Sequence, residues 1–198
     1  MPADGLQLLG IDAAQIQDVI LTHLHYDHAG TLESFPRARF HLQDKESTFA
    51  TGRCMCHDFF RQPYNVEDLV AMIRHLFAGR ITFHDGAAEL APGLSVHLVG
   101  GHTAGLQVVR IWTKRGWVVI ASDATHLYAN MGRGAPFPIV YNVADMIEGY
   151  RVVRELADSE DHIVPGHDPL VMQRYPPPSA ELHGVAVRLD VPPRYATE

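Results

Sequence analysis

The stretch Thr22-His23-Leu24-His25-Tyr26-Asp27-His28-Ala29-Gly30 contains four potential metal ligands within six residues, directly after the apolar run Val19-Ile20-Leu21. The apolar run predicts a short buried strand, and Gly30 suits a turn or the start of a close-packed helix. His23 and His25 are two residues apart, so an extended backbone points both imidazoles to the same side. Asp27 and His28 follow from the turn and can face a second point nearby. Imidazoles combined with a carboxylate favour two zinc-like ions side by side.

Three later segments also place a histidine or an aspartate directly after an apolar run that reads as a strand. They are Gly100-Gly101-His102-Thr103, Ala121-Ser122-Asp123-Ala124 and Pro165-Gly166-His167-Asp168. The alternative for the first stretch alone is a histidine-rich surface loop. Four segments that agree on one geometry favour the metal site.

These four motifs, HLHYDHAG, GGHT, ASDA and PGHD in this order, resemble those of the metallo-β-lactamase superfamily. The form of the first motif resembles the N-acyl homoserine lactone lactonase branch, and the resemblance runs from about residue 11 to residue 175. It implies the α/β class and an αβ/βα sandwich. It also implies two zinc ions, with other divalent metals as alternatives. One ion would be held by His23, His25 and His102, the second by Asp27, His28 and His167, with Asp123 bridging both.

The resemblance implies a hydrolase in which a hydroxide held between the two metals is the nucleophile. Metal binding lowers the pKa of water from 15.7 toward about 7, and one metal also polarises the substrate carbonyl. The expected reaction opens a lactone ring, most simply that of an N-acyl homoserine lactone, which is quorum quenching. Asp27 counts as a catalytic residue as well as a ligand.

The residue that holds the substrate carbonyl is left open between two candidates. In the lactonase branch a tyrosine lies three residues after the bridging aspartate, but here that position is His126 and the nearest tyrosine is Tyr128. Either side chain can donate a hydrogen bond to an oxyanion. We favour Tyr128 by a small margin, because a loop shifts its register by two residues more easily than an imidazole replaces a phenol.

Two irregular segments, residues 51–65 and 128–141, are expected to form the rim of the pocket. An acyl chain needs an apolar lining, and these segments supply candidates for substrate binding. The candidates are Met55, Phe59, Phe60, Met131 and Phe137. The alternative, that these side chains only anchor long loops, is slightly favoured. The remaining histidines are assigned structural or surface roles.

The composition predicts one globular domain over residues 1–198. A net charge of −7 argues against a nucleic-acid partner, and only two lysines occur, Lys45 and Lys114. Cys54 and Cys56 are too close in sequence for a disulfide, and neither a membrane span nor a signal peptide is visible. These features predict a cytoplasmic protein with no membrane partner, and the resemblance implies a small-molecule lactone substrate. A homodimer is also expected.

Periodicity predicts further elements along the chain. Helices are expected at 30–35, 43–50, 66–77 and 143–157, and strands at 38–42, 80–84, 94–99, 106–113, 117–121 and 163–164. Family members usually carry several strands before the first metal loop, and the 22 residues that precede His23 do not supply them. One sheet should therefore be short of strands, with Val19–Leu21 and Phe40 less covered than core residues.

Other functions fit the same metal centre. A 4-pyridoxolactonase-like enzyme, a hydroxyacylglutathione hydrolase and a β-lactamase are the alternatives among hydrolases. The glutathione thioester needs basic residues to clamp a carboxylate, and this lysine-poor chain shows no obvious set. The alternative from a different class is a truncated metal-binding domain without activity.

Overall fold

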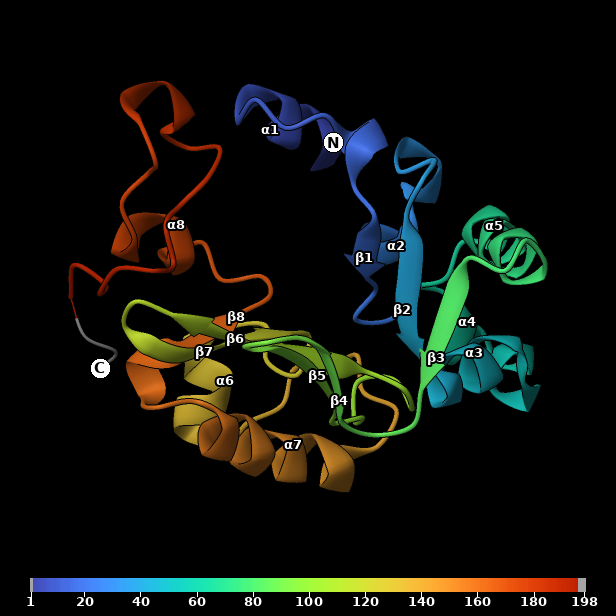
Figure 1. Cartoon of the computed structure of the whole chain (residues 1–198). Coiled ribbons are helices and arrows are strands. Elements are labelled where there is room, and N and C mark those ends of the chain that lie inside the picture. The colour runs from blue at the N-terminus through green and yellow to red at the C-terminus, as the bar shows by residue number, and fades with distance from the viewer. Residues whose placement is uncertain (1, 196–198) are drawn as a thin grey trace. The chain divides into compact units, whose positions relative to one another are not determined.

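The computed structural model describes residues 2–195, which form two compact units that divide between Asp85 and Gly86 (Figure 1). Each unit has its own hydrophobic core. The prediction of a single domain over residues 1–198 stays a prediction. Among the described residues no helix combines the length and the apolar character that crossing a bilayer requires.

The first unit is built on a three-stranded parallel sheet in the order β1-β2-β3 (Figure 1). The strands are β1 (Asp18–Ile20), β2 (Arg39–Gln43) and β3 (Ile81–His84). Val19 lies opposite Phe40, and Phe40 lies opposite Ile81, so these three side chains share one face. They belong to the same apolar cluster as Met72. The three predicted strands are confirmed to within about two residues, a normal uncertainty for element ends.

Helices of the first unit connect and cover these strands. They are α1 (Pro2–Leu8), α2 (Tyr26–Ala29), α3 (Asp44–Thr51), α4 (Asp58–Arg61) and α5 (Val66–Phe77). The prediction of a helix at 66–77 is confirmed at both ends. The side chain of Asn65 accepts a hydrogen bond from the Glu67 amide at its start, and Gly79 follows its end at φ 70°. The predicted helix at 30–35 is only a 3₁₀ turn, Leu32–Ser34.

The expectation for the N-terminal segment is met in one respect and wrong in another. Between Pro2 and Asp18 the described chain forms α1 and a 3₁₀ turn, Ala13–Gln15, and no strand, so β1 is an edge strand. Val19 and Ile20 are only half-buried, as expected, whereas Leu21 is only 3% exposed and Phe40 is fully buried. Phe40 lies on the central strand of the sheet, where the core that includes Met72 covers it without any additional strand.

The second unit contains a five-stranded sheet in the order β4-β5-β6-β7-β8. The strands are β4 (Ala88–Ala91), β5 (Leu94–Leu98), β6 (Gln107–Thr113), β7 (Gly116–Ser122) and β8 (Ile163–Pro165). All neighbours are antiparallel except β7 and β8, which are parallel. Strand β4 was not predicted, because its alternation covers only four residues.

The α-helices of the second unit, within residues 86–195, are α6 (Tyr128–Arg133), α7 (Val143–Leu156) and α8 (Leu170–Arg174). Figure 1 shows α7 running across one face of the five-stranded sheet. Met146 and Tyr150 of α7 join Val119 of β7 in the core. The interpretation of residues 128–141 as wholly irregular is wrong, because α6 begins that segment and Gly134 ends it in the left-handed conformation at φ 60°.

Candidate metal centre

The first set of predicted ligands lies in the loop that follows β1. The Leu21 amide still donates to His41 on β2, and the chain then leaves the sheet. The ring centroids of His23 and His25 are 4.5 Å apart, and those of His23 and His28 are 4.1 Å apart. His25 occupies the N-cap of α2, so the helix begins immediately after the second ligand. The short strand and short helix therefore gather three imidazoles at one point.

The fourth ligand of this set, Asp27, lies on α2. Its Oδ2 is 3.5 Å from Nε2 of His28, and its side chain is more exposed than that of its partner. Thr22 Oγ1 lies 3.2 Å from Nδ1 of His23 and 3.3 Å from Nδ1 of His28. A hydroxyl at this point fixes the orientation of both rings, as outer partners of metal-binding histidines do.

A buried carboxylate stabilises the loop that carries His23 and His25. Glu46 on α3 is fully buried and accepts hydrogen bonds from the Leu24 amide and the Tyr64 hydroxyl, both at 3.0 Å. The Tyr64 ring in turn meets the His25 ring edge-on at 4.6 Å. Burial, followed by the charge of Glu46, raises the pKa of Tyr64, so its hydroxyl stays protonated and donates. Sequence reasoning missed both Glu46 and Tyr64, because neither belongs to a ligand motif.

The second set of ligands surrounds Asp123, directly after β7. Its Oδ2 lies 3.4 Å from Nε2 of His102, and its Oδ1 lies 3.2 Å from Nε2 of His167. The preceding residue, Ser122, has φ 46°, which is costly for a residue with a side chain and is typical of functional turns. A β-carbon on Gly166 would lie 2.8 Å from Asp123 Oδ1, so glycine is required beside the carboxylate.

The contacts of His102 suit a ligand of a metal ion. Its Nδ1 is 2.7 Å from the Ile139 carbonyl, so this nitrogen carries a proton and donates. In the neutral ring Nε2 then presents a lone pair to the Asp123 carboxylate, which is repulsive. A proton on Nε2, or a metal ion held by both atoms, removes this repulsion.

His126 belongs to the same cluster. Its Nε2 is 2.9 Å from Asp123 Oδ2, and its ring centroid is 4.5 Å from that of His167. The Phe137 ring stacks on it at 3.4 Å with an interplanar angle of 10°. One nitrogen or oxygen each from His102, Asp123 and His126 lies within 4.8 Å of the others. His126 thus lies beside the predicted ligands His102 and Asp123, among donors of the kinds that bind zinc-like divalent ions.

Tyr128 has other surroundings. Its amide donates to Asp168 Oδ2 at 2.9 Å, and the guanidinium of Arg174 lies 4.5 Å from its ring centroid. Burial raises the pKa of its hydroxyl. Asp168 also accepts from the Leu170 amide, so it acts as a cap between two loops. The described contacts of Tyr128 are thus with the α8 region, whereas those of His126 are with Asp123.

The predicted substrate-binding residues lie in different surroundings. Met55 lines a cavity of about 710 Å³ in the first unit together with Tyr26, Tyr64 and Leu69. Phe60 packs edge-on against Phe59 and Phe49, with Phe59 exposed. In the second unit Met131 is buried in the core, and Phe137 stacks on His126. The structure thus places Met55 at a cavity and Met131 among core residues.

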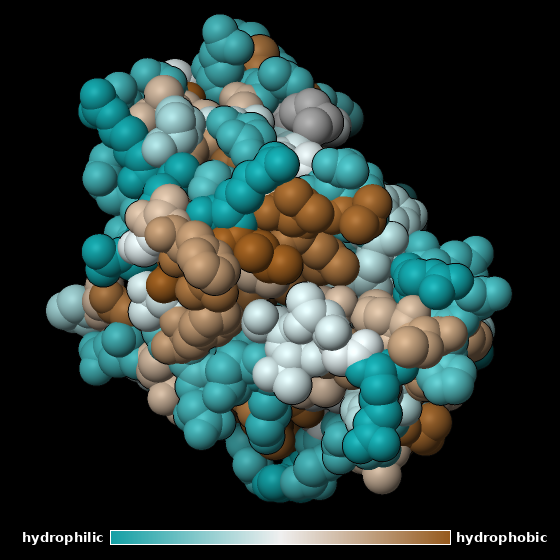
Figure 2. All heavy atoms as spheres, turned by 90° about the vertical axis from the view of Figure 1, so that its right-hand side faces the viewer, coloured by the Kyte–Doolittle hydropathy of each residue, from teal (hydrophilic) through white to brown (hydrophobic). Residues whose placement is uncertain are grey.

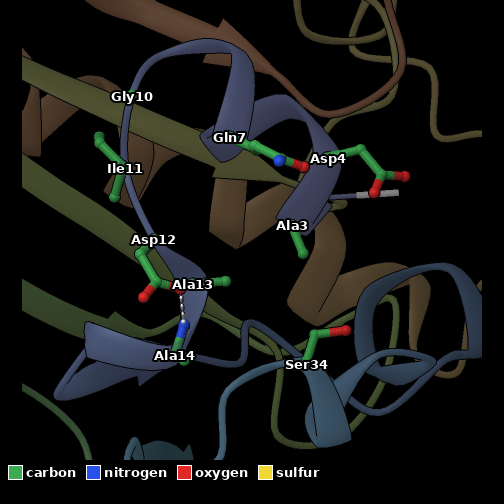
Figure 3. Close-up of a pocket in the computed structure, with 9 residues that line it drawn as sticks. All are labelled: Ala3, Asp4, Gln7, Gly10, Ile11, Asp12, Ala13, Ala14 and Ser34. Carbon is green, nitrogen blue, oxygen red and sulfur yellow. Dashed lines mark hydrogen bonds between the residues drawn. The ribbon is translucent and has the colours of Figure 1, made fainter.

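A further hollow in the first unit, about 520 Å³, lies beside α1 and contains none of the predicted ligands (Figure 3). Ala3, Asp4 and Gln7 of α1 line one side, with the segment from Gly10 to Ala14 opposite. The side chain of Asp12 accepts from the Ala14 amide, as the dashed line in Figure 3 marks. This aspartate is thus a helix cap.

Comparison with known proteins identifies the family. Residues 1–181 match the metallo-β-lactamase superfamily. An N-acyl homoserine lactonase, AiiB of Agrobacterium fabrum, is 34% identical over 134 residues, which cover 65% of this chain and 48% of AiiB. The AttM lactonase of Azorhizobium caulinodans is 28% identical over 174 residues, with 83% and 62% of the two chains covered. The chain spans about half the length of AiiB, and somewhat more of AttM.

Comparison with solved structures supports the same fold. A crystal structure of an N-acyl homoserine lactone hydrolase, with the product N-hexanoyl-L-homoserine bound at its catalytic metal centre, matches with a TM-score of 0.71 and 23% identity. The match covers 86% of this chain and 63% of that one. The predicted α/β fold class is confirmed, and the chain belongs to the metallo-β-lactamase superfamily.

Proposed function

We propose that the chain carries the metal centre of a dinuclear hydrolase that opens the lactone ring of N-acyl homoserine lactones. The observation that carries this proposal is the Asp123 cluster, in which one carboxylate turns each oxygen to a different histidine. The similarity to proteins named N-acyl homoserine lactonases supports the choice of substrate. The metal is proposed to be zinc, since imidazole and carboxylate donors suit it.

In this proposal both ligand sets would serve one centre. His23, His25 and His102 would hold the first ion, and Asp27, His28 and His167 would hold the second. Asp123 would be shared by both, and its geometry within the second unit supports that role. Oδ2 faces His102, a ligand of the first ion, and Oδ1 faces His167, a ligand of the second. Each oxygen of Asp123 thus has a proposed ligand of a different ion beside it.

When bound, the ions supply a water of lowered pKa and polarise the carbonyl oxygen of the substrate. The chain's own residues do the rest. Glu46 and Tyr64 fix the loop that carries His23 and His25. His102 is held by the Ile139 carbonyl in the tautomer that leaves Nε2 available as a ligand.

His126 is the proposed donor to the carbonyl oxygen of the substrate. It lies against Asp123, and the stacked Phe137 ring keeps its imidazole in one orientation. Its position, three residues after Asp123, is also that of the tyrosine in the lactonase branch. The contacts therefore reverse our preference from the sequence, which favoured Tyr128.

The cavity lined by Tyr26 and Met55 is the proposed site for the acyl chain. Tyr26 directly follows the ligand His25, so this cavity begins next to the metal loop. Its lining also includes the apolar residues Val66 and Leu69, which suit an alkyl chain. Cytoplasmic location and a homodimer stay predictions.

The proposal is tested by a lactone-opening assay with a pH indicator, on full-length chain loaded with zinc. Parallel samples contain N-acyl homoserine lactones of several acyl lengths, a glutathione thioester and a β-lactam. We expect ring opening of the acyl homoserine lactones and close to two zinc ions per chain by elemental analysis. Turnover of only the thioester or the β-lactam refutes the substrate. Metal content at trace level after refolding with zinc refutes the dinuclear centre.

A further inference from the structure

Helix α5 carries two separate apolar stripes. Leu69 and Met72 face the core of the first unit. The second stripe consists of Val66, Val70, Ile73 and Phe77. Its spacings of four, three and four residues are those of a coiled-coil seam, in which apolar side chains meet a partner helix.

The second stripe lies at the surface. Val66 is 65% exposed, Ile73 39% and Phe77 87%. Phe83 on β3 is 38% exposed and pairs with Leu42, so it lies on the same sheet face as the core and extends the apolar surface at this edge strand. Figure 2 shows hydrophobic side chains gathered on the side where α5 and β3 lie in Figure 1. A large contiguous apolar patch on a soluble domain marks a binding surface.

We propose that this stripe binds the same stripe of a second copy of the chain, with the two α5 helices antiparallel about a twofold axis. Charged residues beside the stripe indicate that its binding partner is a second copy of the chain. Glu67 and Arg74 are seven residues apart, so they lie on one flank of the stripe, and both are exposed. Within residues 2–195 neither side chain takes part in an ion pair.

A twofold axis between antiparallel helices keeps equivalent flanks on the same side. Residues equally distant from the middle of the stripe then face each other, so Val66 meets Phe77 and Val70 meets Ile73 of the second copy. Glu67 lies about two residues' rise, or about 3 Å along the axis, from the partner subunit's Arg74. The reciprocal pair forms at the other end, as an isologous interface requires.

A parallel arrangement does not use these charges. It would place Glu67 and Arg74 opposite the other flank, where Leu69 and Leu76 lie. The opposite charges of one flank are complementary only when the second helix runs in the reverse direction. The stripe is therefore matched to itself in apolar pattern and in charge.

The expected dimer is weak. The helix has 12 residues. One helix pair of this length, with a few neighbouring side chains, buries less than the roughly 1,200 Å² typical of stable interfaces, so dissociation constants in the micromolar range are expected.

Sedimentation velocity of the full chain, from about 1 to 200 µM, measures this association. Wild-type protein should shift from monomer to dimer in that range. Phe77→Glu removes the most exposed side chain of the stripe and should weaken association at least about 10-fold. The matched control is Val185→Glu, an exposed apolar residue of the second unit that should leave association unchanged.

The charge swap tests the orientation. Glu67→Arg alone and Arg74→Glu alone each break two pairs and create like-charge contacts, so each should weaken dimerisation by about 10-fold. The double variant, Glu67→Arg with Arg74→Glu, should restore it. Wild-type protein that stays monomeric up to about 200 µM, a dimer that survives Phe77→Glu, or a double swap that fails to restore dimerisation overturns the proposal.

Discussion

Gly166→Ala tests whether the Asp123 carboxylate is held in a position that has no spare room. The added β-carbon would lie 2.8 Å from Asp123 Oδ1 and equally close to the Ser122 carbonyl, closer than carbon atoms tolerate. Its backbone φ is not in the left-handed region, so alanine is conformationally allowed and the effect is crowding alone. Overpacking of this kind costs about 1–3 kcal/mol.

The structure can relieve this strain in two ways, and each has a measurable effect. If the backbone shifts, the metal-free protein melts about 2–12 °C lower, at roughly 2–4 °C per kcal/mol for a chain of this size. If the carboxylate rotates away instead, zinc affinity falls by about 10–100-fold, the usual cost of displacing a group at a metal site. Thermal unfolding with chelator and competition of zinc against a chelating dye separate these effects.

Gly132→Ala is the matched control. Gly132 lies in α6, and a β-carbon there meets nothing within 4 Å. This substitution should raise stability by up to about 1 kcal/mol through helix propensity and leave zinc affinity unchanged. If Gly166→Ala changes neither melting nor affinity relative to this control, the carboxylate is not confined and the reasoning is refuted.

Three further outcomes are expected. Asp123→Ala should lose bound zinc and turnover together in elemental analysis and the lactone assay, and a variant that keeps both ions contradicts the bridging role. His126→Ala should keep its zinc and lower kcat by roughly 10²–10³-fold, whereas Tyr128→Phe should keep near-normal kcat; the reverse result restores Tyr128 as donor. Burial, with His41 beside it, lowers the pKa of His84, so the unfolded chain binds more protons just below about pH 6.5. The stabilising contribution should therefore be complete above that pH and decrease as the pH drops toward the pKa of the folded state. With chelator present, the melting temperature of His84→Gln should fall less between about pH 7.5 and 5.5 than that of wild type. Equal falls contradict the assignment of this pH dependence to His84.

The positions of the four motifs in the fold were predictable from the sequence, because each motif follows an apolar run that forms a strand. The apolar run identifies each strand, and the predicted ligand lies just beyond the end of that strand. Leu21 precedes the first loop, and Ser122 precedes Asp123, as the structure places them. Helix α5 was predictable to the residue, because a cap, an apolar period and a terminal glycine agree there.

The different surroundings of His126 and Tyr128 were not predictable, because they depend on where a turn points two neighbouring side chains. The Leu127 backbone separates them, and α6 begins at Tyr128. Helix formation at that point directs the tyrosine toward Arg174, while His126 remains in the turn beside Asp123. Residues 128–141 showed no strong helical period, so the helix that decides this was missed.

Support for the ligands is distributed through the sequence in a way that no motif records. Glu46 lies 22 positions from Leu24, the residue whose amide it accepts from, and 18 from Tyr64. A buried carboxylate is costly unless it is hydrogen-bonded, and both of these donors bond to its Oε1. The same bonds fix the backbone between His23 and His25 and the ring that contacts His25. The hydrogen bonds that stabilise the buried Glu46 carboxylate therefore also hold the loop with His23 and His25 in place. This role explains why an acidic residue occupies an otherwise apolar position of α3.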